Sequence, residues 1–309
     1  MKIVFMGTPD FAAVTLSKLL EAGHQVVAVV TQPDKPKGRG KAIAYSPVKE
    51  LALQHNIEVL QPVKVKEEEF IHTLEEINPE VIVVAAFGQI LPKRILDMPK
   101  FGCINVHASL LPKYRGAAPI QWVVVNGETE AGVTIMHMDV GCDTGDMIIK
   151  DKITLEKKET GGSLHDKLAV LGGNLIIKAL TLIEEGKAPR EQQIEEESTY
   201  VKMLSKEDGK IDFSKSAIEI ERLIRGLNPW PSAFTSLHGK MLKLWEADAI
   251  ESEKKGEIGE VVEVTKNSIH IQTGDGILAI KELQLEGKKR MTVDAFLLGY
   301  SVNVHDHVG

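Results

Sequence analysis

The fold is decided at the start of the chain, where residues 2–31 read KIVFMGTPDFAAVTLSKLLEAGHQVVAVVT. Residues 2–6 form a short apolar run, which is typical of a buried parallel strand. Asp10 is suited to begin an amphipathic helix that continues to about residue 22, and Gly23 is placed to end it. Residues 25–31 predict a second strand. Strand, helix and strand in this order predict a βαβ unit.

A βαβ unit raises the question of a dinucleotide cofactor. The turn after the first strand is Gly7-Thr8-Pro9-Asp10, which lacks the three glycines that bring a backbone against a pyrophosphate. This pattern excludes a nicotinamide cofactor. Helical and strand patterns then alternate at residues 47–56, 57–60, 66–77 and 81–86. They predict an α/β fold with an open, doubly wound, mostly parallel sheet.

Two polar side chains emerge where a further strand, residues 102–106, becomes a loop. Asn105 and His107 are two positions apart, so in a strand they share a face. An amide donor beside an imidazole can hold and protonate one carbonyl-derived oxygen. A core histidine satisfied by backbone groups is the alternative. Residues 87–92, FGQILP, also follow a strand, and we expect this turn and the Asn105 loop to form opposite walls of one pocket, unless it is an ordinary turn.

Residues 132–138 predict another strand, followed at residues 139–146 by DVGCDTGD. Three aspartates among glycines suggest a calcium loop, but the spacing and the distal glutamate of an EF-hand are missing. We therefore expect no metal. A tight loop that delivers one carboxylate back to His107 is the better interpretation.

A basic stretch follows the second strand, where residues 32–41 read QPDKPKGRGK. Two prolines and two glycines argue against a helix or a strand, so we expect an exposed loop. One interpretation is a solvated connection. The other is an anion-binding finger, in which Arg39 reaches a phosphate or a base edge.

Composition limits the class of protein. The 309 residues are 43% hydrophobic, which is enough for two domains, and neither a signal peptide nor a membrane-spanning run is expected. Cys103 and Cys142 are too few for a disulfide framework or a zinc site, so we expect a reducing cytoplasm. A formal net charge of −7 argues against widespread phosphate contacts. Any RNA contact should be local.

The second half of the chain has a different pattern of predicted helices and strands. Residues 160–186 predict a long helix interrupted at Gly172-Gly173, residues 187–198 are charged and read as a linker, and residues 214–227 predict an amphipathic helix. Five short strands are then expected at residues 233–237, 241–247, 259–264, 268–272 and 277–285. They suggest a small OB-like β-barrel, a fold suited to RNA.

A family resemblance joins these observations. The pattern Asn105-x-His107-x-Ser-Leu-Leu-Pro-x-x-Arg-Gly resembles the signature of the folate-dependent formyltransferases. The resemblance covers nearly the whole chain, and its supporting motifs are residues 7–12 (GTPDFA), 32–34 (QPD), 38–41 (GRGK), 139–146 (DVGCDTGD) and 228–231 (NPWP).

The resemblance implies a Rossmann-like catalytic domain over residues 1–188, a linker at 189–202 and an OB-like, tRNA-binding barrel at 203–309. It also implies roles for individual residues. The implied site comprises catalytic Asn105, His107 and Asp143, the folate-binding residues Ser109, Leu110, Leu111 and Pro112, and the tRNA contacts Arg39 and Lys41.

The expected reaction moves the formyl group of 10-formyltetrahydrofolate, the co-substrate, to the α-amino group of methionine on initiator tRNA, without a metal. We expect a cytoplasmic monomer. Formyl transfer to a small amine, an amino sugar nucleotide or glycinamide ribonucleotide, stays open because those relatives share the Asn-x-His pair and the downstream aspartate. A catalytically silent RNA-binding module is a third possibility, but it leaves these three residues without a purpose.

Overall fold

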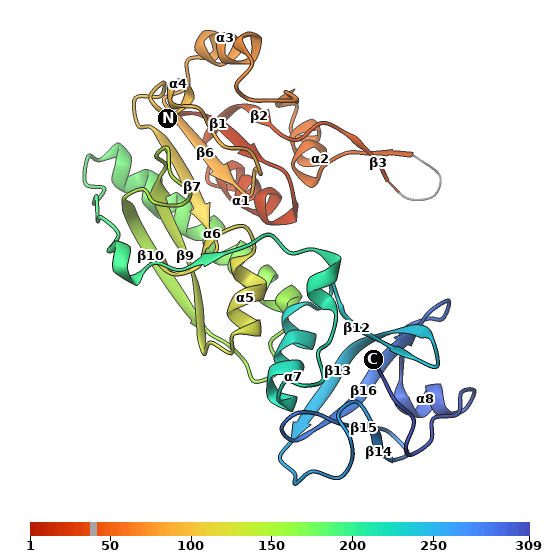
Figure 1. Ribbon diagram of the computed structural model, residues 1–309. Coiled ribbons are helices and arrows are strands. Elements are labelled where there is room, and N and C mark those ends of the chain that lie inside the picture. Colours follow the sequence, from red (N-terminus) through yellow and green to blue (C-terminus); the bar gives the residue numbers. More distant parts are fainter. Residues whose placement is uncertain (38–41) are drawn as a thin grey trace. The chain divides into compact units, whose positions relative to one another are not determined.

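The structure, a computed structural model, describes residues 1–37 and 42–309. The chain divides into two compact units, each described by itself below (Figure 1). Unit 1 comprises Met1–Gly116, Glu130–Thr154 and His165–Val201, and unit 2 comprises Ala117–Thr129, Leu155–Leu164 and Lys202–Gly309. The domain boundaries given above stay predictions. Within the described ranges, no helix is long and apolar enough to cross a membrane.

Unit 1 is built on a seven-stranded sheet in the order β10-β9-β7-β6-β1-β2-β5. Its strands are β1 (Lys2–Gly7), β2 (Gln25–Val30), β5 (Glu58–Leu60), β6 (Val81–Ala85), β7 (Cys103–His107), β9 (Glu130–His137) and β10 (Met147–Thr154). The first five strands pair in parallel, whereas β9 runs antiparallel to both β7 and β10. The predicted mostly parallel sheet is therefore confirmed.

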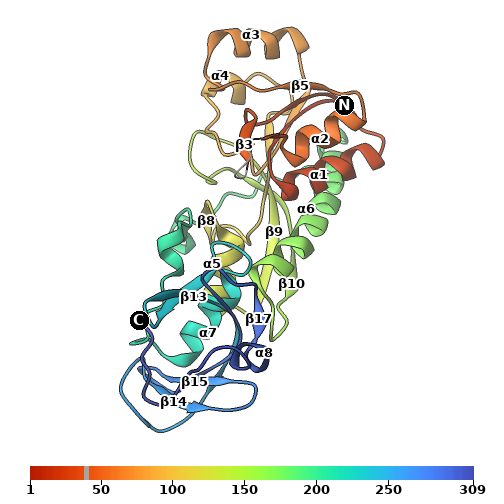
Figure 2. The same ribbon diagram turned by 90° about the vertical axis from the view of Figure 1, so that its right-hand side faces the viewer.

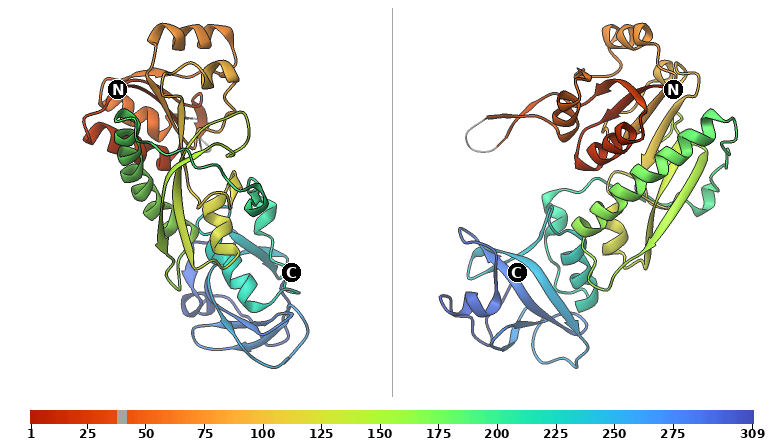
Figure 3. Two further views of the ribbon diagram at one scale, coloured as in Figure 1. Left: turned by 90° about the vertical axis from the view of Figure 1, so that its left-hand side faces the viewer. Right: turned by 180° about the vertical axis from the view of Figure 1, so that it is seen from behind.

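Helices cover both faces of this sheet, as Figures 2 and 3 show. The helices of unit 1 are α1 (Asp10–Glu21), α2 (Pro47–Gln54), α3 (Glu68–Ile77), α4 (Lys93–Leu96) and α6 (Gly161–Glu184), the last of which begins in unit 2. One face of the central strands packs against α3 and α4, through Val4, Ile82 and their neighbours, in a single apolar cluster. Burial on both faces explains why β6, with all five residues buried, reads as a continuous apolar run.

The long helix α6 is continuous, so the predicted interruption at Gly172-Gly173 is wrong. The two glycines instead allow close packing against the rest of unit 1. A Cβ atom at Gly172 would lie 2.8 Å from Val106 Cγ1, and one at Gly173 would lie 2.7 Å from Lys18 Cγ. The cost of glycine inside a helix, about 1 kcal/mol relative to alanine, is offset by this approach.

The basic stretch also differs from the expectation of a loop. Residues Lys35–Lys37 form β3, which pairs antiparallel with β4 (Ala42–Ala44) in a two-stranded ribbon. Arg39 and Lys41 lie outside the described residues, and their assigned roles stay predictions.

Unit 2 carries a six-stranded antiparallel sheet in the order β12-β13-β16-β15-β14, with β17 paired to β16. Its strands are β12 (Ala233–Leu237), β13 (Lys240–Ile250), β14 (Val261–Val264), β15 (Ile269–Gln272), β16 (Ile277–Leu285) and β17 (Met291–Thr292). All five strands predicted from sequence are present. The helical elements are α5 (Pro119–Val125), α7 (Ala217–Gly226), α8 (Val293–Leu297) and the short turn η2 (Lys206–Gly209).

The last residues of the chain join the two edges of this sheet. Val308 bridges Leu237 at the end of β12, and His307 bridges Glu260 just before β14. The backbone N–H of Val308 also donates to the Gly259 carbonyl at 2.9 Å. The antiparallel β domain expected after the α/β domain is therefore confirmed, and His307 and Val308 connect its two edges.

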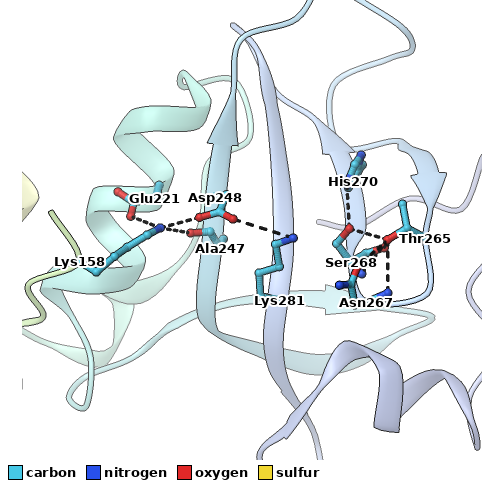
Figure 4. A network of polar contacts seen from close by, with 9 residues as sticks. All are labelled: Lys158, Glu221, Ala247, Asp248, Thr265, Asn267, Ser268, His270 and Lys281. Carbon is cyan, nitrogen blue, oxygen red and sulfur yellow. Dashed lines mark hydrogen bonds and ion pairs between the residues drawn. The ribbon is translucent and has the colours of Figure 1, made fainter.

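A network of charged side chains around Glu221 holds α7 to its neighbours in unit 2, and Figure 4 shows its contacts with Lys158 and Asp248. Glu221 on α7 is only 5% exposed, and its carboxylate accepts from Arg225 Nε at 2.6 Å. Lys158 Nζ lies 3.5 Å from Glu221 Oε1 and donates to Asp248 Oδ1 on β13 at 2.6 Å. Glu221 is the buried charge of this network, and its contacts with Arg225 and Lys158 offset the cost of burying the carboxylate. The segment Leu155–Leu164 is thereby fixed to α7 and β13.

Candidate active site

Strand β7 carries Asn105 and His107 to its carboxyl end. Cys103 on the same face packs into the apolar cluster under α3 and α4, while Val106 on the other face lies against α6. Alternation along the strand then places Asn105 and His107 side by side beyond the cluster. Asn105 is half-buried, and His107 is 6% exposed.

Asp143 comes from residues 138–146, the loop between β9 and β10. Asp139 Oδ1 holds the loop together by accepting from the Gly141 N–H at 2.9 Å and from Thr144 Oγ1 at 2.6 Å. A Cβ atom at Gly145 would lie 1.8 Å from the His137 carbonyl oxygen, so only glycine fits there. Asp143 itself has a left-handed backbone with φ of 56°. An aspartate tolerates this conformation better than most residues, but something must hold it.

The three predicted catalytic residues converge. Asp143 Oδ2 lies 3.6 Å from His107 Nδ1, and Asn105 Nδ2 lies 3.5 Å from Asp143 Oδ1. The backbone N–H of Gly116 donates to Asp143 Oδ2 at 2.8 Å. Of these contacts only the last is short, so Asn105 and His107 touch the carboxylate loosely. The long contact leaves the Asn105 amide able to turn toward a substrate oxygen.

The second ring nitrogen of His107 faces the backbone. Nε2 lies 3.0 Å from the Tyr114 carbonyl oxygen, which can only accept, so Nε2 carries the proton in this contact. Nδ1 is then the nitrogen that faces Asp143. A substrate oxygen must therefore compete with the Tyr114 carbonyl for the Nε2 proton, because Nδ1 can donate only when the ring carries a second proton.

The predicted folate-binding residues 109–112 form a loop that is tied to the protein. Ser109 is 1% exposed, and its hydroxyl donates to the Lys113 carbonyl at 2.7 Å. Thr134 Oγ1 on β9 donates to the Ser109 carbonyl at 2.7 Å and accepts from the Leu111 N–H at 3.1 Å. The Leu111 side chain is buried in a small cluster with Met136 and Met147. The other two residues of the loop, Leu110 and Pro112, are half-buried. Binding of folate by this loop stays a prediction.

Neither cysteine is arranged as a nucleophile. Burial raises the pKa of the Cys103 thiol to about 12. Burial and the neighbouring Asp143 carboxylate together raise the pKa of the Cys142 thiol. A nucleophilic cysteine needs a lowered pKa, so the chemistry rests on the other groups of the site.

Three site groups have no clear signal in the sequence. The Tyr114 carbonyl and the Gly116 N–H are backbone groups, and their partners are fixed only by the path of the loop. Gln193 lies in the charged stretch expected to be a linker, yet its side chain donates to the Asp143 carbonyl. A contact across 50 residues of sequence leaves no local pattern.

Comparison with known proteins defines the class. The formyl transferase family model matches residues 1–180, and the model of the formyl transferase C-terminal domain matches residues 203–301. The chain belongs to the formyl transferase family.

Within this family the chain is similar along its length to methionyl-tRNA formyltransferases. It is 57% identical over 302 residues to that of Agathobacter rectalis, covering 98% of this chain and 97% of the relative. It is 53% identical over 302 residues to that of Clostridioides difficile, with 98% of each chain covered. It is also 50% identical to that of Alkaliphilus oremlandii over the full length of both.

Solved structures share the fold at lower identity. A sugar 3N-formyl transferase, WlaRD, superposes with a TM-score of 0.68 at 23% identity, covering 94% of this chain and 99% of its own. HypX from Aquifex aeolicus in complex with tetrahydrofolic acid superposes with a TM-score of 0.65 at 17% identity, covering 99% of this chain and 51% of its own. These likenesses support the fold.

Proposed function

We propose that this protein transfers the formyl group of 10-formyltetrahydrofolate to the α-amino group of methionyl initiator tRNA. The product is N-formylmethionyl-tRNA, which serves translation initiation. The observation that carries the proposal is identity of 50–57% to methionyl-tRNA formyltransferases over nearly the whole chain. The convergence of Asn105, His107 and Asp143 supplies a chemistry that fits it.

The reaction is an acyl transfer between two nitrogens. The unprotonated amine of methionine attacks the formyl carbon, a new C–N bond forms, and negative charge develops on the formyl oxygen. The bond from that carbon to the folate nitrogen then breaks. The attacking nitrogen loses one proton and the departing nitrogen gains one, so the reaction consumes no further reactant.

Each residue of the triad has one task in this scheme. The Asn105 side chain donates from Nδ2 to the formyl oxygen as its charge develops. His107 donates to the same oxygen or relays the proton between the nitrogens. Asp143 faces His107 Nδ1, orients the ring and stabilises positive charge that appears on it in the transition state. The activated formyl donor makes a metal unnecessary in this proposal.

The donor needs a partly apolar site beside these groups. Ile90, in the loop after β6, is 86% exposed, and Val140, in the loop after β9, is 71% exposed. Strands β6 and β7 are neighbours, with Val84 paired to Asn105. We propose that these loops and the loop at residues 109–112 hold the folate.

The tRNA acceptor is proposed to contact the basic stretch, where Arg39 and Lys41 lie, and the antiparallel domain. The overall charge of −7 means that phosphate contacts must be local. We also propose that the enzyme acts as a monomer in the cytoplasm, where charged tRNA is used.

Formation of tetrahydrofolate in a single turnover tests the proposal. The purified protein is mixed with 10-formyltetrahydrofolate and one acceptor: methionyl initiator tRNA, the uncharged tRNA, an amino sugar nucleotide or glycinamide ribonucleotide. We expect a burst only with the charged tRNA. A burst with a small amine would instead identify a small-amine formyltransferase, and none with any acceptor would identify a non-catalytic module.

A further inference from the structure

Residues 190–201, which we term the strap, lie against both loops of the active site within unit 1. At one end, Glu191 and Met147 exchange two backbone hydrogen bonds of 2.8 and 3.0 Å, next to the Asp143 loop. At the other end, β11 (Tyr200–Val201) pairs in parallel with β8 (Arg115–Gly116), next to the His107 loop. The strap therefore bridges the two segments that supply the catalytic groups.

One side chain in the middle of the strap spans the gap. Gln193 Nε2 donates to the Asp143 carbonyl and to the Gly145 carbonyl, both at 2.8 Å. Its Oε1 accepts from Arg115 Nε at 3.0 Å. Both carbonyls can only accept and the guanidinium can only donate, so one orientation of the amide satisfies all three contacts. A glutamate could keep the Arg115 contact but could donate to neither carbonyl.

Arg115 gives this side chain a fixed support. The Arg115 side chain is 1% exposed, and its NH1 group donates to Glu195 Oε2 and to Tyr200 Oη, both at 2.8 Å. Its backbone N–H donates to the Thr199 carbonyl at 2.8 Å. Gln193 is therefore hydrogen-bonded to a buried guanidinium that its own contacts hold in one position.

The position of Asp143 depends on the hydrogen bonds that Gln193 makes with the backbone of its loop. Its contacts with the β7 side chains are long, 3.5 Å to Asn105 and 3.6 Å to His107, so they do not fix it. Its left-handed backbone, with φ of 56°, also has to be held in place. The two hydrogen bonds from Gln193 grip the carbonyls at Asp143 and two residues later. They set where the carboxylate stands relative to His107 and the Gly116 N–H.

We propose that Gln193 is a positioning residue for the formyl transfer, an inference that rests on the proposed function. It acts through the backbone of Asp143 and touches no substrate. Displacement of a catalytic group by about 1 Å can slow a reaction by about 10². Loss of the Gln193 amide should therefore lower kcat while leaving substrate binding largely intact.

The test compares Gln193→Glu with Gln192→Glu in the full-length protein. Both substitutions replace an amide by a carboxylate on neighbouring residues, but Gln192 is exposed. We expect Gln193→Glu to lower kcat for methionyl-tRNA formylation at least tenfold, with KM for both substrates within threefold of wild type. Gln192→Glu should match wild type. Equal kcat values for the two variants would overturn the proposal.

A second measurement does not depend on activity. The Gly116 amide is protected by Asp143 Oδ2, so its hydrogen exchange reports where the carboxylate stands. We expect the peptide that carries Gly116, followed by mass spectrometry, to exchange at least tenfold faster in Gln193→Glu than in Gln192→Glu. Unchanged exchange would overturn the proposal. If the wild type forms no product, the proposed function fails while this comparison still decides the role of Gln193.

A milder substitution, Gln193→Asn, keeps the test possible if the Gln193→Glu protein does not fold. Gln193→Asn keeps the amide but shortens the side chain by one methylene, so it cannot reach both carbonyls and Arg115 together. If Gln193→Glu does not fold, Gln193→Asn is measured in its place, and the same lowered kcat and faster Gly116 exchange are expected. Wild-type values for a folded Gln193→Asn would then overturn the proposal.

Discussion

At the scale of single residues, the site is loosely assembled around one carboxylate. Asp143 receives a short hydrogen bond from the Gly116 backbone, while Asn105 and His107 stand at 3.5 and 3.6 Å. Side chains held this way can move by a few tenths of an ångström at little cost when a substrate arrives. This arrangement suits side chains that stabilise a developing charge. Asn105 and His107 are aligned before the reaction, yet their contacts with Asp143 are long enough to adjust.

Removal of either side chain should slow the chemistry more than it weakens folding. We expect His107→Ala and Asn105→Ala each to lower kcat for formyl transfer by roughly 10² to 10⁴, the usual effect of one acid–base or oxyanion group. Asp143→Asn should also lower kcat, since a neutral amide cannot stabilise a positive ring. Turnover is measured with both substrates saturating, and thermal melting checks that each variant is folded. Near-normal turnover of His107→Ala or Asn105→Ala would refute its assigned role.

Arg39 separates a tRNA enzyme from a small-amine enzyme with the same catalytic centre. A guanidinium forms charge-assisted hydrogen bonds with phosphate or a base edge, each worth about 1.5–3 kcal/mol. We expect Arg39→Ala to lower kcat/KM for methionyl-tRNA at least tenfold, with folate binding nearly unchanged and partial recovery in Arg39→Lys. The assay is repeated across salt concentrations. Wild-type efficiency of Arg39→Ala at every salt concentration would remove this support for a tRNA acceptor.

At the scale of elements, strand β7 and helix α6 determine where the catalytic groups stand. Val106 lies between Asn105 and His107 in sequence and points to the opposite face, where Gly172 of α6 packs closely against it. Strand alternation was readable in the sequence, and so was the pairing of Asn105 with His107 on one face. The continuity of α6 cannot be predicted from the sequence, because two adjacent glycines indicate a break in a helix unless the surface they pack against is known.

The two glycines of α6 should respond differently to the same substitution. Gly172→Ala places a methyl group 2.8 Å from Val106 in the core, and such overpacking costs about 1–3 kcal/mol. A methyl group at Gly173 would lie 2.7 Å from Lys18 Cγ and 3.2 Å from Lys18 Cβ, so it fits only if the Lys18 side chain, which is 33% exposed, changes its rotamer. We expect Gly172→Ala to lower the melting temperature and kcat. Gly173→Ala should lower the melting temperature less, because Lys18 lies at the surface and alanine regains up to about 1 kcal/mol of helix propensity. The reverse order of melting temperatures would contradict this packing argument.

At the scale of the whole molecule, much of the architecture follows from local pattern. The alternating elements of the first half and the five short strands of the second half were predicted because each has its own periodicity and turn residues. What the pattern misses is contact between distant segments. Gln193 meets Asp143 across 50 residues, and the chain end meets β12 and β14, without any local signal. The choice of Asp143 over Asp139 and Asp146 likewise came from the family pattern rather than from the loop.

The stability of the whole molecule should depend on the protonation of His137, at the end of β9. Burial, with a further contribution from Arg190, lowers the pKa of His137 from 6.5 to about 4, so the folded state keeps the ring neutral. The unfolded chain binds the proton below about pH 6.5. Stability from this group is therefore complete above that pH and is lost as the pH falls toward 4, by on the order of 3 kcal/mol. Urea unfolding of the wild type, His137→Gln and the exposed control His55→Gln between pH 7 and 4.5 measures this loss. We expect His137→Gln to lose less stability than the other two over that range, and parallel pH profiles for all three would contradict it.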